Sequence, residues 1–402
     1  MVSRFRAIVF LRDVMYLALT SFGGPQAHIA HFQKHLIVKR RYISEAELNE
    51  LYALCQILPG PTSTQTICAI GYKLGGARLA YLTLLIWALP SVMVMTAAGI
   101  LIGNLESKDL SLDFTIFLQP MAVGFVFYAA FSIGTRSVIT KSGIGLMVFA
   151  AVAAYFIQSP IVFPVTLLIA GALTAIKYKS QPKEEKKPIN LRWNNFFLWA
   201  GVLILAAAIG GLTKSLPVRL FENFYRNGSL IFGGGQVLTP MLYTEFVQYL
   251  KPVADGVAKP YVTAEEFLSG LAITQALPGP LFSFSAFLGS LAMHSRDYGV
   301  VAQVSGAIFS AAGIFLPGTF LIFFMIRVYE SLKMYRPIRA SLEGISAANA
   351  GLVTAGAILL YQPLDLSALN ISTTIITFLL LAFTRIPSWV MIPCGLLLGF
   401  LI

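Results

Sequence analysis

The sequence predicts an all-α polytopic membrane protein with two inverted-topology repeats, each containing a Pro/Gly-broken re-entrant helix pair. Three observations support this fold class. First, the chain of 402 residues is 57% hydrophobic and only 12% charged, which excludes an ordinary soluble domain. Several of its apolar runs approach the ~20 residues that span a bilayer. Second, motifs of the first half return in the second half. Third, the loops of the two halves carry different charges.

A proline- and glycine-containing stretch occurs twice, each time inside an apolar segment. The first copy reads ALCQILPGPTS and the second reads AITQALPGPLFS. Proline lacks a backbone donor and clashes with the preceding helical turn, and it pushes the residue before it out of the helical region. We therefore expect each copy to be two short helices that meet at a break inside the membrane. The break residues are Pro59, Gly60 and Pro61 in the first copy, and Pro278, Gly279 and Pro280 in the second.

The duplication covers nearly the whole chain. The Phe-Gly-Gly motif at Phe22 returns at Phe232, and the LPGP motif of the first break returns at the second. Further along, Pro90 is matched by Pro317 and Pro160 by Pro387. The offset between matching residues grows along the chain, which indicates small insertions in the second half. We divide the chain into a first membrane repeat (1–177), a cytoplasmic linker (178–193), an inverting extra span (194–213) and a second membrane repeat (214–402).

The expected elements follow in order. An interrupted apolar helix at 5–22 precedes a more polar helix that carries three histidines. The first broken pair at 44–75 opens with Ser44 and Glu47, which have the spacing of a capping box. Further spans are expected at 79–103, 114–136, 142–157, 160–177 and 194–213, and in the second half at 299–326, 340–361, 366–383 and 386–402.

The loop charges predict the orientation. The net charge of +11 could suggest nucleic acid binding, but the basic residues lie in short loops between spans, which is the positive-inside pattern. The loop with Glu106 is acidic, whereas its counterpart around Lys333 is basic. We therefore expect a multi-pass protein of the cytoplasmic membrane with its N-terminus inside and its C-terminus outside. No cleavable signal peptide is expected at the N-terminus.

The two breaks predict a substrate site, because broken helices at matching positions of two repeats mark the binding site in many transporters. The half-helix after each break exposes unpaired N–H groups and the positive end of its dipole, which favours an anion. Neutral side chains near the breaks can orient hydrogen bonds to it. They are Gln56, Ser63 and Gln65, and Gln275, Ser283 and Ser285.

The glycine-rich turns have two interpretations, helix packing or lining of the site. They comprise Gly23 and Gly24, and Gly233, Gly234, Gly235 and Gln236. Arg40 and Arg41 are either orientation signals or residues that steer anions to the inner mouth.

Other polar residues support weaker hypotheses. His28, His31 and His35 share a helical face, but no carboxylate or cysteine at matching spacing completes a metal site, so we expect none. Carriers of a coupled proton are sought among the acids that could lie at membrane depth, namely Glu222, Glu245 and Glu343. The three cysteines have no paired spacing, which indicates neither a disulfide framework nor a redox centre.

The first half resembles the chromate ion transporter family. The residues that carry the resemblance are Phe22 to Pro25, His28, Val38 with Arg40 and Arg41, and the segment Ala53 to Gln65. The second half resembles the C-terminal repeat of that family in FGGGQVLTPMLYTEFV and AITQALPGPLFSFSAFLG. Tyr42 stands where the family usually has tryptophan. The resemblance implies a long two-repeat carrier that exports chromate and confers chromate resistance.

Membrane energetics agree with export. Moving one charge across 100 mV is worth about 2.3 kcal/mol, so a dianion gains roughly 4.6 kcal/mol on leaving a negative interior. The expected partners are chromate, sulfate as a competitor, the lipid bilayer and, as a candidate assembly, a homodimer, with no nucleic acid and no cofactor. The alternatives are a sulfate or related oxyanion permease, a membrane-embedded reductase and a passive channel; we expect no enzyme.

Overall fold

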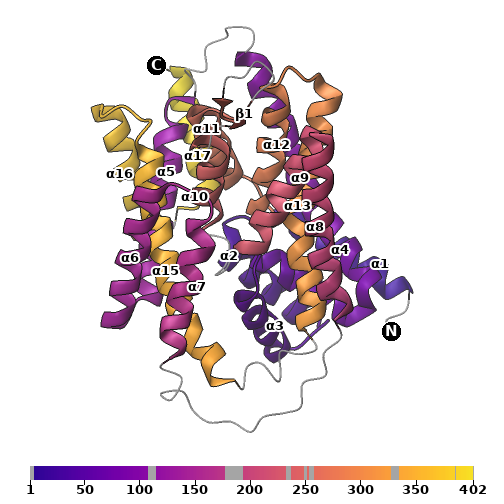
Figure 1. Ribbon diagram of the computed structural model, residues 1–402. Coiled ribbons are helices and arrows are strands. Elements are labelled where there is room, and N and C mark those ends of the chain that lie inside the picture. The colour runs from indigo at the N-terminus through magenta and orange to yellow at the C-terminus, as the bar shows by residue number, and fades with distance from the viewer. Residues whose placement is uncertain are drawn as a thin grey trace. The chain divides into compact units, whose positions relative to one another are not determined.

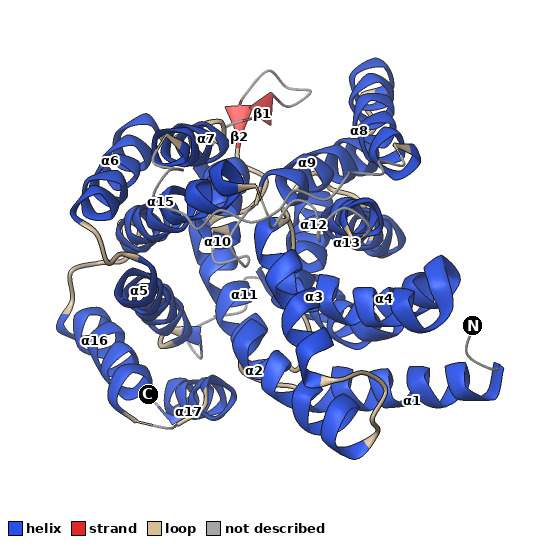
Figure 2. Cartoon of the chain, turned by 90° about the horizontal axis from the view of Figure 1, so that it is seen from below, coloured by secondary structure: helices blue, strands red, loops and turns tan. Residues whose placement is uncertain are grey.

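The computed structural model describes residues 4–106, 115–176, 193–231, 237–248, 251–252, 258–326, 335–384 and 386–401, and these residues are almost entirely helical (Figures 1 and 2). The first half contains α1 (Arg4–Thr20), α2 (Gly24–Phe32), the π-helix η1 (Gln33–Lys39), α3 (Glu45–Ile57), α4 (Thr62–Glu106), α5 (Leu118–Ser137), α6 (Lys141–Ile157) and α7 (Val162–Ala175).

The second half begins after the predicted linker, of which all but residue 193 lies outside the described residues. It contains α8 (Asn194–Thr213), α9 (Leu216–Leu230), α10 (Leu238–Tyr243), the π-helix η4 (Thr244–Gln248), α11 (Ala264–Ala276), the 3₁₀-helix η5 (Leu281–Ser283), α12 (Phe284–His294), α13 (Val300–Met325), α15 (Arg336–Tyr361), α16 (Ala368–Phe383) and α17 (Ser388–Leu401). Two residue pairs, β1 (Lys251–Pro252) and β2 (Ala258–Lys259), form a small antiparallel ladder.

Five described helices are long and apolar enough to cross a membrane. They are Thr62–Asn104 of α4, α5, α8, α13 and α15. The extra span α8 has the bounds expected from the sequence. Only 11% of its 18-residue apolar stretch is buried inside the protein. The helical content and these spans confirm the all-α polytopic membrane class.

The chain forms two compact units, and each takes segments from both halves of the sequence. Unit 1 comprises Met1–Ile100, Asn190–Gly235 and Leu277–Tyr329. Unit 2 comprises Leu101–Ile189, Gln236–Ala276 and Glu330–Ile402. The first break and the residues from Leu277 onward, including Gly279, therefore belong to unit 1.

Glycines allow the helices of unit 1 to pack closely. A Cβ atom on Gly313 of α13 would lie 2.6 Å from the Phe221 carbonyl oxygen of α9, and one on Gly228 of α9 would lie 2.8 Å from the Ile314 carbonyl oxygen. In α12 and α13, Gly289 and Gly306 face each other in the same way. Small residues at such crossings let helix backbones approach closely within a membrane.

Unit 2 is organised around α15, which packs against α5, α6 and α7. Gly344 meets the Ala170 carbonyl of α7, and Gly351 meets the Met147 carbonyl of α6, so closely that neither position has room for a Cβ atom. In α15, 72% of the 18-residue apolar stretch is buried inside the protein.

The first broken pair folds back on itself. Its arm α3 and its arm Thr62–Leu74 have thirteen residues each, about 20 Å at 1.5 Å per residue, which is too short for a ~30 Å hydrocarbon core. A kink at Gly75 and Gly76 separates the second arm from the rest of α4. The outer ends of the two arms meet where Lys73 Nζ donates to Glu47 Oε1 at 2.6 Å. The chain therefore enters and leaves this hairpin at the same end.

Capping boxes start the corresponding helix in both repeats. Ser44 and Glu47 bond reciprocally at the start of α3, which confirms the capping box predicted there. Thr263 and Glu266 do the same at the start of α11. Both residues stand at the same offset from their counterparts as the second LPGP motif does from the first. The two broken pairs therefore begin alike.

The Glu47–Lys73 pair at the open end of the hairpin predicts a pH dependence. The hydrogen bond from Lys73, followed by that from the Ser44 backbone, lowers the pKa of Glu47 from 4.5 to about 2. Because the folded pKa is lowered, the stabilisation is complete above pH ~4.5 and is lost as the pH falls toward about 2. Both side chains are more than a third exposed, so the effect should stay below about 1 kcal/mol.

We expect Lys73→Met to lower the thermal unfolding temperature in detergent slightly at pH 7. The difference from wild type should shrink as the pH is lowered from 4.5 toward 3. A difference that grows in this range would contradict the assignment.

Candidate functional site

The first break is confirmed as an interruption between two helices. Helix α3 ends at Ile57 and α4 begins at Thr62, and between them Gly60 adopts a φ of +117°. The Gly60 N–H donates to the Ile231 carbonyl, at the end of α9, over 2.7 Å. The Gln65 amide donates to the Pro59 carbonyl at 2.7 Å. Backbone groups released by the break are thus satisfied within the protein, as non-helical backbone at membrane depth requires.

The second break has a reciprocal arrangement. Helix α11 ends at Ala276, Gly279 adopts a φ of +91°, and the Gly279 N–H donates to the Ser21 carbonyl, beyond the end of α1, over 2.9 Å. Ser21 and Ile231 occupy equivalent positions, each directly before a Phe-Gly-Gly motif. Each break is therefore bonded to the end of the first helix of the other repeat, as a two-fold relation between the repeats would produce.

The long helices α4 and α13 also approach the break of the other repeat. A Cβ atom on Gly60 would lie 3.3 Å from Gly318 Cα, and one on Gly279 would lie 3.3 Å from Ser91 Oγ. Ser91 and Gly318 follow Pro90 and Pro317, the prolines that the sequence duplication pairs. The predicted motif pairs of the two repeats thus meet inside unit 1.

A buried polar turn follows the first break. The five residues Thr62–Thr66 are at most 4% exposed although all are polar. Ser63 Oγ lies 3.0 Å from Nδ1 of His28, and Trp87 Nε1 donates to Thr64 Oγ1 at 3.2 Å. The Thr62 hydroxyl, Gln65 Oε1 and His28 Nε2 are buried without a hydrogen-bond partner. Of these three atoms, the Thr62 hydroxyl and His28 Nε2 can donate hydrogen bonds, whereas Gln65 Oε1 can only accept. The turn begins a helix, where unpaired N–H groups and the dipole favour an anion.

The predicted side chains of the first repeat separate into two groups. Ser63 and Gln65 lie in the buried turn, whereas the Gln56 side chain in α3 is exposed. The Gln65 side-chain amide donates to the Pro59 and Gly318 carbonyls. It therefore stabilises the backbone of the break. Gly23 caps the start of α2 with a φ of +94°, and Gly24 follows with a φ of +76°.

The predicted side chains of the second repeat are less alike. Ser283 is 1% exposed and its hydroxyl has no partner, whereas the Ser285 hydroxyl donates to the Phe282 carbonyl at 2.8 Å. Gln275 belongs to unit 2, where its backbone carbonyl accepts from the Ser388 hydroxyl at 2.9 Å. Gly233, Gly234, Gly235 and Gln236 lie outside the described residues. A role in substrate binding stays a prediction for all of these residues.

Arg40 has a partner that sequence reasoning missed. Its Nη2 donates to Oδ1 of Asp13 at 2.8 Å, and the Tyr42 hydroxyl donates to Oδ2 at 2.6 Å. His35 Nε2 lies 3.1 Å from Oδ1, and Asp13 is 3% exposed. The hydrogen bond to Asp13 raises the pKa of Arg40; burial, then the same carboxylate, raise the pKa of Tyr42. An acid within an apolar helix was the available signal.

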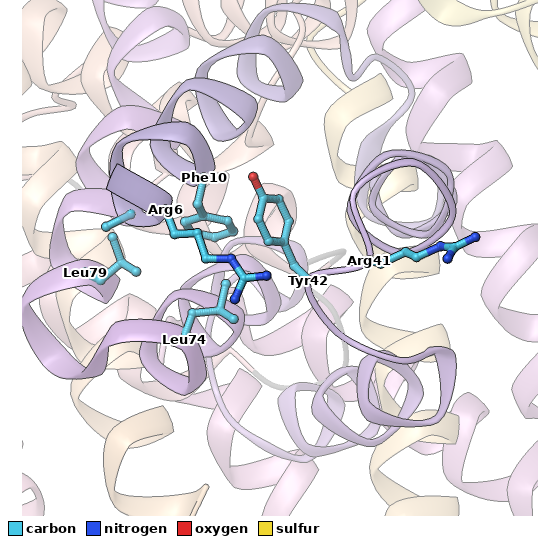
Figure 3. Close-up of a pocket in the computed structure, with 7 residues that line it drawn as sticks. Arg6, Phe10, Arg41, Tyr42, Leu74 and Leu79 are labelled. Carbon is cyan, nitrogen blue, oxygen red and sulfur yellow. The ribbon is translucent and has the colours of Figure 1, made fainter. Parts of the chain in front are cut away.

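A basic cavity of about 100 Å³ lies beside this cluster (Figure 3). Figure 3 shows the Arg6 guanidinium between Leu74 and Tyr42, whereas the Arg41 side chain points away. Arg41 is exposed and adopts a φ of +53°. Arg40 is paired with Asp13, and a steering role for either arginine stays a prediction. The cavity is lined by Arg6, Ala7, Phe10, Arg41, Tyr42, Leu74 and Leu79.

The other candidate residues are the possible metal ligands, the cysteines and the candidate proton carriers. The described residues contain no group of three histidine, cysteine, aspartate or glutamate side chains that could hold a metal ion. The three cysteines are free. Among the candidate proton carriers, Glu222 pairs with Arg226 at 3.0 Å, and Glu343 accepts from Thr140 at 2.6 Å. Glu245 is 2% exposed and lies in the π-helix η4.

The chain is similar to several known transport proteins over most of its length. The chain is 27% identical over 380 residues to a "Probable chromate transport protein" of Synechococcus elongatus, covering 93% of this chain and 87% of the relative. It is 26% identical over 351 residues to a "Chromate transport protein" of Pseudomonas aeruginosa, covering 86% and 78%. It is 23% identical over 402 residues to an "Uncharacterized transporter" of Methanocaldococcus jannaschii, covering 98% and 94%.

No solved structure matches the chain. The family described as "Chromate transporter" matches residues 8–176 and again residues 218–400. These two matches confirm the two repeats, and together they cover most of the chain. The protein therefore belongs to the chromate transporter family.

Proposed function

We propose that the protein is a secondary transporter that exports chromate across the cytoplasmic membrane and thereby confers chromate resistance. The observation that carries this proposal is the buried polar turn Thr62–Thr66, which begins a half-helix directly after a break. Backbone N–H groups and neutral side chains at this position can bind a tetrahedral dianion without a buried cation. Two relatives named as chromate transport proteins support the choice of anion.

The membrane potential favours transport of a dianion out of the cell. Each charge that crosses 100 mV is worth about 2.3 kcal/mol, so the exit of a dianion gains roughly 4.6 kcal/mol. At about 1.4 kcal/mol per decade, this sustains a gradient of roughly three decades. Import would have to overcome the same energy with co-transported cations. The potential alone is therefore sufficient for export.

Inside-out vesicles test the proposal directly. Labelled chromate should accumulate in vesicles that contain the protein, and an interior-positive potential should increase the accumulation. Gln56→Ala and Gln275→Ala belong beside wild type, and each should reduce uptake if its amide lies on the substrate path. Accumulation of sulfate but not chromate would favour an oxyanion permease instead. Accumulation of labelled chromate in right-side-out vesicles, but not in inside-out vesicles, would reverse the proposed direction.

The inverted orientation of the repeats has its own test. We place the N-terminus inside and the C-terminus outside, with the linker 178–193 in the cytoplasm. Reporter fusions in the loops near Glu106 and Lys333 should then lie on opposite sides of the membrane. Fusions that report the same side would contradict this orientation.

A further inference from the structure

His28 has an unused hydrogen-bonding atom at the first break. The residue is 1% exposed in α2, its Nδ1 lies 3.0 Å from Ser63 Oγ, and its Nε2 has no partner. The ring is fixed edge-on against Trp87, with centroids 5.2 Å apart, and is stacked on Phe32 at 6.5 Å. It therefore cannot turn freely to find another partner.

The contact with Ser63 sets which ring nitrogen carries the hydrogen. A hydroxyl group needs an acceptor for its hydrogen, and among the described contacts Ser63 Oγ has Nδ1 of His28 alone. When Ser63 donates to Nδ1, a neutral imidazole carries its hydrogen on Nε2. Nε2–H is then a buried donor without an acceptor in normal hydrogen-bond geometry, an arrangement that folded proteins rarely leave unsatisfied.

A second buried hydroxyl without a partner begins the helix that carries Ser63. The Thr62 hydroxyl, also 1% exposed and without a partner, lies at the start of the same helix as Ser63. The Ser21 carbonyl lies beside the ring as a weak backbone hydrogen-bond acceptor. It also receives the Gly279 N–H at 2.9 Å, and its geometry toward Nε2 is poorer than that of a normal hydrogen bond. His28 thus stands between the polar turn of the first break and the residue that holds the second.

We propose that His28 binds the transported oxyanion through Nε2–H, oriented by Ser63, with the Thr62 hydroxyl as a second neutral donor. This proposal rests on the proposed function, because it assigns residues to the same substrate site. A neutral imidazole contributes a directed donor without a fixed positive charge, so a dianion is held but can still leave. Hydrogen bonds to charged groups are roughly twice as strong as neutral ones.

Substituting His28 with asparagine or glutamine distinguishes the roles of the two ring nitrogens. Glutamine can place its NH₂ near the position of Nε2, whereas asparagine reaches only the position of Nδ1. We expect His28→Asn and His28→Phe to weaken chromate binding about 10- to 100-fold. His28→Gln should stay within about threefold of wild type. The dissociation constant is measured by equilibrium dialysis of labelled chromate against purified protein in nanodiscs.

Control variants keep the test interpretable if a His28 variant folds poorly. Thr62→Val removes the hydroxyl and should weaken binding, whereas Thr62→Ser keeps it and should not. His31→Asn and His31→Gln lie on the same helix at a half-buried position and should bind as wild type does. Thermal unfolding of each variant identifies loss of folding.

The outcomes are distinct. Failure of the wild-type protein to bind or transport chromate would refute the proposed function itself. If wild type binds chromate while His28→Asn, His28→Phe and Thr62→Val bind equally well, the inference alone is refuted. In that case buried water, rather than substrate, satisfies Nε2 and the Thr62 hydroxyl, and the variants should change stability only.

Discussion

Replacing Gly60 with alanine is expected to reduce chromate transport in vesicles by about tenfold or more. Gly60 adopts a φ of +117°, a conformation that costs other residues about 1–3 kcal/mol. The added Cβ atom would also lie 2.9 Å from Gln65 Nε2 and 3.3 Å from Gly318 Cα. Relief of these contacts would displace the amide that holds the Pro59 carbonyl and would distort the polar turn that follows. Labelled chromate uptake measures the effect.

Two glycines elsewhere serve as controls for Gly60→Ala. Gly76 has a φ of +73° with open space where a Cβ atom would lie, and Gly134 in α5 has open space and no positive φ. Gly76→Ala should therefore show backbone strain alone, and Gly134→Ala should be nearly neutral. Gly279→Ala should resemble Gly60→Ala with a smaller effect, because its closest contacts are 3.3 Å. Wild-type uptake by Gly60→Ala would show that the break geometry is dispensable.

The second large effect is expected for Asp13→Ala, which should destabilise the protein by about 3 kcal/mol or more. Asp13 accepts from Arg40 and Tyr42 and contacts His35. Removing the carboxylate leaves these polar groups without their common partner in a mostly buried position. Because 1 kcal/mol corresponds to about 2–4 °C for mid-sized domains, the thermal unfolding temperature in detergent should fall by about 6 °C or more.

A double variant tests whether the loss comes from an unpaired charge. Asp13→Ala combined with Arg40→Ala should recover part of the stability, because the remaining cation is removed with its partner. Glu47→Gln is the matched exposed control: its partner is Lys73, and both side chains are more than a third exposed, so its effect should stay below about 1 kcal/mol. An equal loss in Asp13→Ala and Glu47→Gln would contradict the buried cluster.

Features governed by local chemistry could be predicted from the sequence. The breaks at Pro59 and Pro278 follow from the missing proline donor, and the cap at Ser44 follows from its spacing to Glu47. The bounds of α8 follow from one apolar run between polar segments. The duplication also pairs Pro90 with Pro317, and the residues after these prolines contact opposite breaks.

Features governed by contacts between distant residues could not be predicted in this way. Nothing local indicates that Gly60 donates to Ile231, or that Gln65 donates to Pro59 and Gly318. The five consecutive polar residues of Thr62–Thr66 were a usable signal, since uninterrupted polarity inside a membrane segment is costly unless it is satisfied. The π-helical turn that contains His35 has no sequence signature in this chain.

The reciprocal bonds of the two breaks have a consequence for biosynthesis. The amide of Gly60 finds its acceptor only when Ile231 has been made, nearly a full repeat later in the chain. At about 5–20 residues per second, the ribosome needs roughly 10 to 30 seconds to deliver it. During that interval the nascent hairpin holds an unsatisfied amide, which the translocon, interfacial water or a chaperone must accommodate. Maturation of the first half therefore waits for the second.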